Sequence, residues 1–257
     1  MNNPVYNDAF YSNEAATSLR CANQVVPLLQ DMFAPASVLD VGCGVGAFLR
    51  SFSEGGVKEC LGLDGDYVPQ NQRMISSENF KAVDLSKPFD IGRRYDMIMS
   101  LEVGEHLDAA VADTFVSSIC HHGDLVVFSA AIPVQMGDHH VNEQWQSYWV
   151  QKFRQCGFYA FDVVRPKIWA NKDIEVYYKQ NIIVFANEAA MRKYPFVLSA
   201  AELNKDPRCF DMVHPELYEA RVGPYQSVVN FISQMAAAGR PFRIRRTPEG
   251  GFAADAA

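Results

Sequence analysis

The segment SVLDVGCGVGAFL, residues 37–49, constrains the fold of this chain more than any other segment. It opens with a short apolar run, continues through the glycines at 42, 44 and 46, and ends in residues that favour a helix. Glycines in such a loop let the backbone turn sharply and let a ligand approach without a Cβ in the way. We therefore expect a strand, a glycine-rich turn and the first turn of a helix in immediate succession.

Short apolar runs of the same kind recur along the chain, and helical patterns separate them. Each run is too short for most helices and lies between turn residues, which indicates strands. The first five are 37–42, 59–64, 80–85, 95–101 and 124–130. Between the last two, apolar residues recur every four positions, which predicts one face of a helix: Leu107, Val111, Phe115 and Ile119. Strands that alternate with helices form a parallel sheet with right-handed crossovers.

Two further runs, 158–164 and 176–186, follow without a long helical segment between them, and predict an antiparallel hairpin at the sheet edge. The expected fold class is α/β: a Rossmann-like, doubly wound, seven-stranded, mostly parallel sheet with an antiparallel edge strand. We expect an N-terminal helical cap over 1–35, a ligand-binding domain over 36–186, and a helical C-terminal extension over 187–257 that packs on the same domain. The last residues, 247–257, are expected to be a frayed tail.

Charge and hydropathy exclude several classes of protein. The formal charge is −7 at pH 7 and the sequence pI is about 5.4, so no basic field attracts a polyanion and nucleic acid is disfavoured as a partner. No stretch reaches 18 consecutive apolar residues, and the start, MNNPVYNDAF, lacks the order of a secretion signal. The six cysteines include no CxxC pair and are interpreted as reduced. We expect a cytoplasmic protein that acts on a small molecule and has no membrane partner; a homodimer is left open.

The glycine loop is compatible with two cofactors. Gly42 and Gly44 match the start of the GxGxxA pattern of a nicotinamide dinucleotide site, and Asp64 lies about 20 residues further on. Asp40, however, stands inside the loop motif, where a carboxylate suits the ammonium of S-adenosylmethionine and would repel a pyrophosphate. Asp64 and Asp84 end the second and third predicted strands, where they are expected to accept the ribose hydroxyls and the adenine amine. This pattern favours S-adenosylmethionine.

The segments VLDVGCGVGAFL, LGLDGD, AVDLSKPF and YDMIMSLEVGEHL resemble, in order, the motifs of class I S-adenosylmethionine-dependent methyltransferases. The resemblance covers residues 36–186 and implies that this domain binds S-adenosylmethionine, with an aromatic residue of the leading segment covering it. The expected cofactor contacts are Asp40, Gly42, Gly44, Asp64, Gly65, Asp84, Leu85, Leu101, Glu102 and Tyr11, with Tyr6 and Phe10 as alternatives to Tyr11.

Glu102, Glu105 and His106 follow the fourth predicted strand, at the edge where parallel sheets bind ligands. Positions i, i+3 and i+4 share one face of a helix, so we expect the three side chains to converge. The segment QMGDHHVNEQW, residues 135–145, follows the fifth strand and opens at the same edge. His139 or His140 would complete a set of two carboxylates and two imidazoles suited to Mg²⁺ or Mn²⁺, with Fe²⁺ and Zn²⁺ as alternatives.

This set resembles the ExxEH-plus-histidine arrangement of RNA 3′-end 2′-O-methyltransferases and the EVxEH segment of ubiquinone-pathway O-methyltransferases. HHVNEQWQSYW and RPKIWANKDIEVYYKQN resemble segments of methyltransferases from glycan and natural-product pathways. The acidic charge counts against an RNA substrate. The predicted catalytic residues are Glu102, His106 and His140, and the predicted metal ligands are Glu102, Glu105, His106 and His140.

The sulfonium of S-adenosylmethionine is a reactive methyl donor, so an enzyme must mainly align the acceptor and remove its proton. A hydroxyl holds that proton tightly, and a cation or an imidazole would help to remove it. We therefore predict methyl transfer to a hydroxyl of a small molecule, a sugar or glycosylated natural product. The alternatives are an N-methyltransferase, an RNA 2′-O-methyltransferase, a nicotinamide oxidoreductase and a non-catalytic nucleotide-binding module. The aromatic and amide side chains expected near the acceptor are Trp145, Tyr148, Trp149, Trp169, Tyr177, Tyr178 and Asn181.

Overall fold

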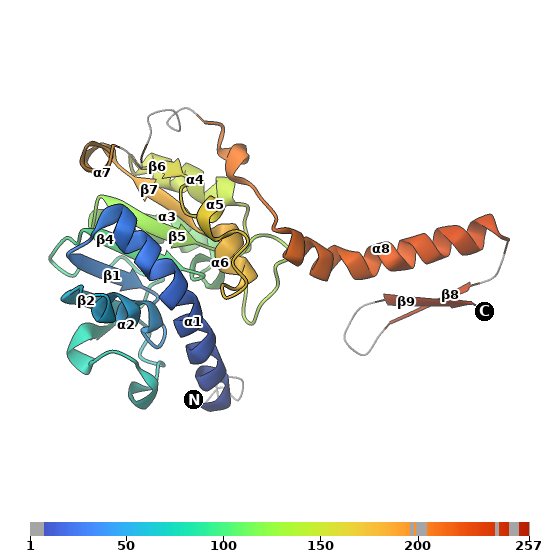
Figure 1. The fold of residues 1–257 in the computed structure, drawn as a ribbon, viewed down its shortest axis with the longest axis horizontal. Coiled ribbons are helices and arrows are strands. Elements are labelled where there is room, and N and C mark those ends of the chain that lie inside the picture. The colour runs from blue at the N-terminus through green and yellow to red at the C-terminus, as the bar shows by residue number, and fades with distance from the viewer. Residues whose placement is uncertain (1–7, 196–197, 199–204, 240–241, 247–251, 257) are drawn as a thin grey trace. The chain divides into compact units, whose positions relative to one another are not determined.

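The computed structural model describes residues 8–195, 198, 205–239, 242–246 and 252–256 (Figure 1). The chain divides into two compact units, Met1–Met212 and Val213–Ala257. The first unit contains one seven-stranded sheet. Its strands are β1 (Ser37–Val41), β2 (Glu59–Asp64), β3 (Phe80–Ala82), β4 (Met97–Leu101), β5 (Leu125–Ser129), β6 (Tyr159–Phe161) and β7 (Ile183–Ala186).

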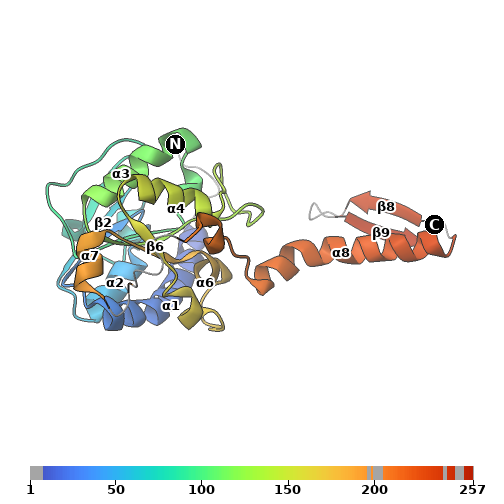
Figure 2. The ribbon, with the colours of Figure 1, turned by 90° about the horizontal axis from the view of Figure 1, so that it is seen from above.

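Helices cover both faces of this sheet. They are α1 (Asp8–Phe33), α2 (Ala47–Glu54), α3 (Ala112–His121), α4 (Gln146–Gln155), α5 (Arg165–Ile168), α6 (Val176–Asn181) and α7 (Glu188–Lys193). Short 3-10 turns are η1 (Gln70–Gln72), η2 (Ser77–Asn79), η3 (Gly104–His106), η4 (Ala109–Val111) and η6 (Pro207–Phe210). Figure 2 shows α3 and α4 on one side of the sheet and α1, α2 and α6 on the other.

The strand order is β3-β2-β1-β4-β5-β7-β6. The pairs β1–β2, β1–β4, β2–β3 and β4–β5 are parallel, whereas β7 runs antiparallel to both β5 and β6. The antiparallel pairing therefore lies at one edge of the sheet. This confirms the predicted α/β, Rossmann-like, mostly parallel sheet.

Two hydrophobic clusters, one on each face, hold the first unit together. Residues on alternate positions of the buried strands point to opposite faces, so that Val38 of β1 joins the cluster under α1 and α2 while Leu39 joins the cluster under α3 and α4. In the second cluster Phe153 stacks on Phe185 with ring centroids 4.0 Å apart and meets Phe128 edge-on at 5.2 Å. Aromatic pairs of this kind contribute about 0.5–1.5 kcal/mol each beyond the area they bury.

The carboxyl ends of the parallel strands lie side by side along one end of the sheet, which we call its carboxyl edge. The glycine loop follows β1, Asp64 ends β2, Glu102 follows β4, and residues 130–145 follow β5. Loops at this edge surround the ligand in open parallel sheets, because the chain leaves every parallel strand there. The sheet thus brings all the predicted site segments except the N-terminal one to a common edge.

Some local predictions were wrong. The segment 176–186 is a strand only in its second half, since Val176–Asn181 is helix α6. The predicted antiparallel pairing at the sheet edge is confirmed by β6 and β7, although helices α5 and α6 lie between them in the chain. The helix expected to include Leu107 and Val111 begins only at Ala112, because η3 and η4 precede it and Leu107 is extended.

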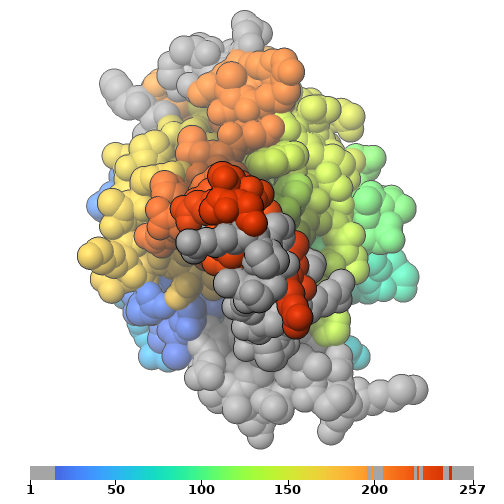
Figure 3. All heavy atoms as spheres, turned by 90° about the vertical axis from the view of Figure 1, so that its right-hand side faces the viewer, coloured from blue at the N-terminus to red at the C-terminus, as the bar shows by residue number. Residues whose placement is uncertain are grey.

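The second unit consists of helix α8 (Pro215–Ala237) and strands β8 (Phe242–Arg246) and β9 (Phe252–Ala256), which pair antiparallel. Figure 3 shows its described atoms in red. The tail expected to fray contains β9. Residues 187–212 belong to the first unit, and the packing of 187–257 on one domain stays a prediction. Across the described parts of both units, no helix combines the length and the apolar character that crossing a bilayer requires.

Candidate active site at the carboxyl edge of the sheet

The glycine loop after β1 has three glycines with positive φ, at Gly42 (83°), Gly44 (53°) and Gly46 (82°). A Cβ on Gly42 would lie 2.3 Å from a methyl carbon of Val103, so only glycine fits there. A Cβ on Gly44 would meet no described atom within 4 Å. The loop is therefore closed by packing at Gly42 and open at Gly44, where a ligand can approach the backbone.

Asp64, at the end of β2, is tied to this loop. Its Oδ2 accepts the N–H of Gly44 at 2.7 Å. Its Oδ1 accepts the N–H of Gly65 and the hydroxyl of Tyr67, each at 2.7 Å. The carboxylate is thus fixed beside the open position in the loop, and the tyrosine hydroxyl bonds to the oxygen expected to accept a ribose hydroxyl.

Asp40 lies within β1 and is 4% exposed. Burial, reinforced by the nearby charge of Asp64, raises the pKa of Asp40 to about 8. A carboxyl group in this environment gains by facing a cation, because the cation offsets the desolvation of its charged form. The predicted role of Asp40 toward an ammonium group stays a prediction.

Asp84 and Leu85 lie beyond β3, which ends at Ala82 and not at Asp84. The Asp84 carboxylate accepts hydrogen bonds from the backbone and hydroxyl of Ser86 and pairs with Lys87 at 2.8 Å. These partners lower the pKa of Asp84 to about 2, and the hydrogen bond from Lys87 makes the largest contribution. Leu85 is buried in the cluster under α3. Their contact with adenine stays a prediction.

Of the other expected cofactor contacts, Leu101 is the buried last residue of β4. The backbone of Phe10 and Tyr11 belongs to α1, but their side chains, and Tyr6 altogether, lie outside the described residues.

Glu102 turns the chain out of β4 with a φ of 55°. Its carboxylate accepts hydrogen bonds from the amide groups of Gln135 (2.8 Å) and Asn181 (3.1 Å). Desolvation raises the pKa of Glu102. The convergence of this cluster therefore does not come from one helical face, as predicted, but from a left-handed residue followed by the 3-10 turn η3.

Glu105, in η3, is completely buried. Neither of its carboxylate oxygens has a hydrogen-bond partner among the residues that the structure describes. Burial and then the charge of Glu102 raise the pKa of Glu105 well above its ordinary value. A buried carboxylate without a donor is costly, and the nearby charge of Glu102 adds to that cost, so Glu105 is stabilised by a proton or a cation.

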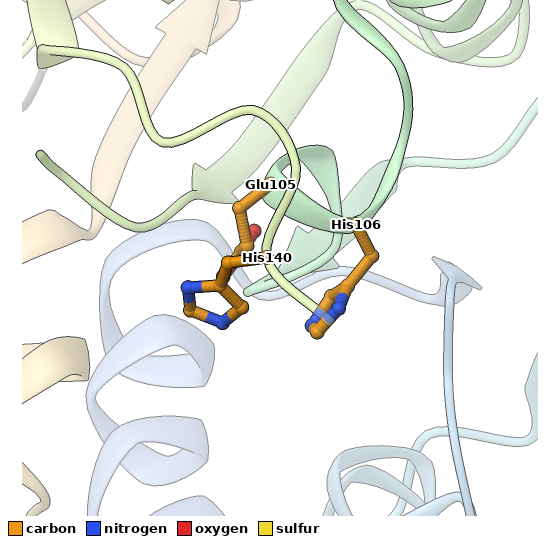
Figure 4. Close-up of side chains that lie close together, drawn as sticks. All are labelled: Glu105, His106 and His140. Atoms are coloured by element: carbon orange, nitrogen blue, oxygen red, sulfur yellow. The ribbon is translucent and has the colours of Figure 1, made fainter. Parts of the chain in front are cut away.

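His106 follows Glu105 in η3, and His140 lies beside both from the loop after β5 (Figure 4). Their rings meet edge-on with centroids 4.9 Å apart. One potential ligand atom from each of Glu105, His106 and His140 lies within 4.8 Å of the others. Desolvation and the neighbouring His140 lower the pKa of His106. The structure thus brings His140, and neither His139 nor Glu102, into the group of three.

The loop that carries His140 is hydrogen-bonded to η3. Val141 and Asn142 donate backbone hydrogen bonds to the carbonyl oxygen of Glu105. Val134, Met136 and His139 all have positive φ, between 59° and 71°. Non-glycine residues in this region cost about 1–3 kcal/mol each and persist only where the surroundings impose them, often at functional sites.

The expected acceptor-binding side chains separate into two groups. Trp145 is 41% exposed at the end of this loop. Trp149 is buried against Gly104 and Phe128, and Tyr178 is buried against Phe48, so both are core residues. Tyr148, Trp169 and Tyr177 are partly buried. Asn181 serves Glu102, a role that its sequence neighbourhood did not indicate.

The methyltransferase domain family matches residues 14–162, more than half of the chain. This chain is a member of the methyltransferase domain family. The match ends before β7, so the methyltransferase domain of this protein extends beyond it to include the last strand of the sheet.

Solved structures share the fold of this methyltransferase domain. DesVI of Streptomyces venezuelae aligns over 70% of this chain and 96% of its own, with a TM-score of 0.53 and 15% identity. The sugar N-methyltransferase KedS8 of Streptoalloteichus aligns over 73% of this chain and 97% of its own, with a TM-score of 0.54 and 14% identity. A probable tocopherol O-methyltransferase of rice is 32% identical over 82 residues, which span 28% of this chain and only 22% of the rice protein.

Proposed function

We propose that this methyltransferase domain binds S-adenosylmethionine and transfers the methyl group to a hydroxyl of a small molecule, a sugar or a glycosylated natural product, with the aid of a divalent metal ion. The observation that carries the proposal is the cluster of Glu105, His106 and His140 at the same sheet edge as Asp64 and the open glycine loop. A cofactor site and a proton-accepting or cation-binding cluster at one edge are what O-methyl transfer requires.

In this proposal the residues in and around the glycine loop each contact a different part of the cofactor. Asp64 accepts the ribose hydroxyls once Tyr67 has moved aside, and the backbone at Gly44 borders the methionyl part. Asp40 faces the ammonium end, directly or through water. The acceptor oxygen then forms a bond with the methyl carbon, the carbon–sulfur bond breaks, and its electron pair leaves with S-adenosylhomocysteine.

The residues present suit a divalent metal ion. Glu105 is buried, lacks a donor among the described residues and has two imidazoles beside it, which together make a set of one carboxylate and two histidines. Two nitrogen donors favour Mn²⁺, Fe²⁺ or Zn²⁺ over Mg²⁺, which prefers oxygen ligands. When bound, the ion would lower the pKa of the acceptor hydroxyl. Glu105, His106 and His140 would hold it, and Glu102 would accept the proton that the acceptor hydroxyl loses. If the site works without metal, Nε2 of His140 accepts the proton from the acceptor.

Calorimetric titration tests the cofactor. We expect S-adenosylhomocysteine to bind with one site per chain and NAD to give no heat. Binding of NAD without a response to S-adenosylhomocysteine would overturn the proposal. The acceptor class is tested by incubating the protein with labelled S-adenosylmethionine and fractions of small metabolites; label acquired at nitrogen, or only by RNA, would refute transfer to a small-molecule hydroxyl.

Metal removal tests the cation. After chelation we expect turnover to fall strongly and to return when Mn²⁺ is added. Glu105→Gln should abolish this recovery, whereas Glu54→Gln, which alters an exposed glutamate paired with Arg50, should leave it intact. Full turnover in a preparation shown to be metal-free would eliminate the cation and leave His140 as the base.

A further inference from the structure

Glu143, at the far end of the loop that carries His140, receives three hydrogen bonds. Its Oε1 accepts the backbone N–H of Met136 at 2.7 Å and lies 2.8 Å from Nδ1 of His140. Its Oε2 accepts the backbone N–H of Val134 at 2.9 Å. The side chains of Glu143 and His140 are only 19% and 12% exposed, so these bonds are shielded from water.

The chemistry of this contact fixes the proton on the imidazole. A carboxylate can only accept, so the contact with Oε1 requires His140 to carry its proton on Nδ1. In the neutral ring Nε2 is then the nitrogen with a free lone pair. Without a partner, a neutral histidine in water prefers the opposite tautomer, with the proton on Nε2, in which the lone pair would point toward Glu143.

The same carboxylate also shapes the loop. The two residues whose N–H groups it binds, Val134 and Met136, both have positive φ, which a valine rarely adopts. These bonds supply part of the constraint that keeps the strained backbone in place. Glu143 therefore determines both where His140 lies and which of its nitrogens is unprotonated.

We propose that Glu143 is a positioning residue, which holds His140 in the Nδ1–H tautomer and so leaves Nε2 as the ring nitrogen that can accept a proton or bind a metal ion. Its use in catalysis rests on the proposed function. The tautomer itself does not, because it follows from the contact with Glu143 alone. No pattern in the sequence indicates this role, although Glu143 lies within the segment 135–145 that follows the fifth strand.

Nitrogen NMR of the ¹⁵N-labelled, metal-free protein at about pH 9 tests the tautomer. Long-range proton–nitrogen spectra distinguish a protonated from an unprotonated ring nitrogen, and His140→Gln identifies the signals of His140 among the six histidines. We expect a protonated Nδ1 and an unprotonated Nε2 in the unaltered protein. A proton on Nε2 there would overturn the proposal without any variant.

Glu143→Leu is the informative variant, because leucine is close to glutamate in size and accepts none of the three hydrogen bonds. We expect the His140 signals to move toward the Nε2–H tautomer, while Glu54→Leu leaves them unchanged. An unchanged tautomer in folded Glu143→Leu would refute the role. If that variant fails to fold, the measurement on the unaltered protein still decides.

Cobalt binding, followed by its visible absorption, separates this inference from the proposed function. Loss of a hydrogen bond that orients a metal-binding histidine weakens metal binding about 10- to 100-fold, and we expect that loss for Glu143→Leu, which has no acceptor. If the unaltered protein shows the Nδ1–H tautomer but binds no Co²⁺, the metal proposal fails and the positioning role stands. If it binds Co²⁺ equally well with and without Glu143, the positioning role fails.

Discussion

The hydroxyl of Tyr67 donates a hydrogen bond to Oδ1 of Asp64, the oxygen that is expected to accept a ribose hydroxyl of the cofactor. Tyr67 is 69% exposed, and its ring lies over Gly65, where a Cβ would be 2.0 Å from a ring carbon. For the ribose to reach Oδ1 of Asp64, the bond from the tyrosine must break. Tyr67→Phe removes this competing donor and should therefore tighten cofactor binding.

The size of the effect follows from the hydrogen bond that competes. Hydrogen bonds to charged groups contribute about 1.5–3 kcal/mol when shielded. Tyr67 is mostly exposed, so screening by water reduces this to about 1 kcal/mol. Since 1.4 kcal/mol corresponds to a tenfold change in affinity, the Kd for S-adenosylhomocysteine should fall about fivefold in Tyr67→Phe.

Calorimetric titration of both proteins with S-adenosylhomocysteine measures this change. Tyr194→Phe is the matched control, because Tyr194 lies away from the carboxyl edge. It follows α7, which comes after Ala186, and Ala186 pairs with the first residue of β5. Weaker binding in Tyr67→Phe would show that the hydroxyl holds the cofactor. Equal binding would show that the tyrosine does not compete, and either result would refute the reasoning.

Three further predictions concern other residues. Asp64→Ala should weaken S-adenosylhomocysteine binding at least about 100-fold, whereas His140→Ala should preserve it and lower turnover; calorimetry and single-turnover assays would expose equal effects. Buried His122 donates to the carbonyl of Ser118 and accepts from the backbone N–H of Ile91, and burial lowers its pKa. The unfolded chain therefore takes up a proton at a higher pH than the folded protein does, and the free energy of unfolding should fall as the pH drops below about 6.5. Urea titrations at several pH values measure this fall, which should be smaller in His122→Gln. The hydrogen bond from Cys120 lowers the pKa of Cys156 to about 7, so alkylation of Cys156 by iodoacetamide should reach half its maximal rate near that pH, and Cys120→Ala should shift the midpoint upward.

The parts of the fold that were predicted correctly depend on signals within a few residues. The apolar runs that form β1, β2, β4 and β5 are buried along their length or nearly so, and the glycines that end β1 have the positive φ values that only glycine adopts easily. These features are written in the local sequence. The strand order and the common edge then follow from the rules that govern parallel sheets.

The parts that were missed depend on contacts between distant residues. VYYKQN has the β-branched and aromatic composition of a strand, yet it forms α6, and its Asn181 binds Glu102, 79 residues away. Glu102 adopts a positive φ, although its spacing from Glu105 is typical of a helix. Local propensity is overridden here by the hydrogen bonds among Glu102, Gln135 and Asn181, which join three distant segments.

The position of β7 between β5 and β6 has a consequence for synthesis of the chain. β6 emerges from the ribosome before β7, yet among the described strands β7 is its only partner, and β7 also covers the open side of β5. Until residues 183–186 are made, β5 exposes an unpaired edge of four apolar residues, Leu125–Phe128. Such an edge pairs readily with other chains. A nascent or truncated chain that stops near Asp162 therefore presents an aggregation-prone strand. We expect the edge of β5 to be covered only when β7 is made, after the glycine loop and the segment around Glu105.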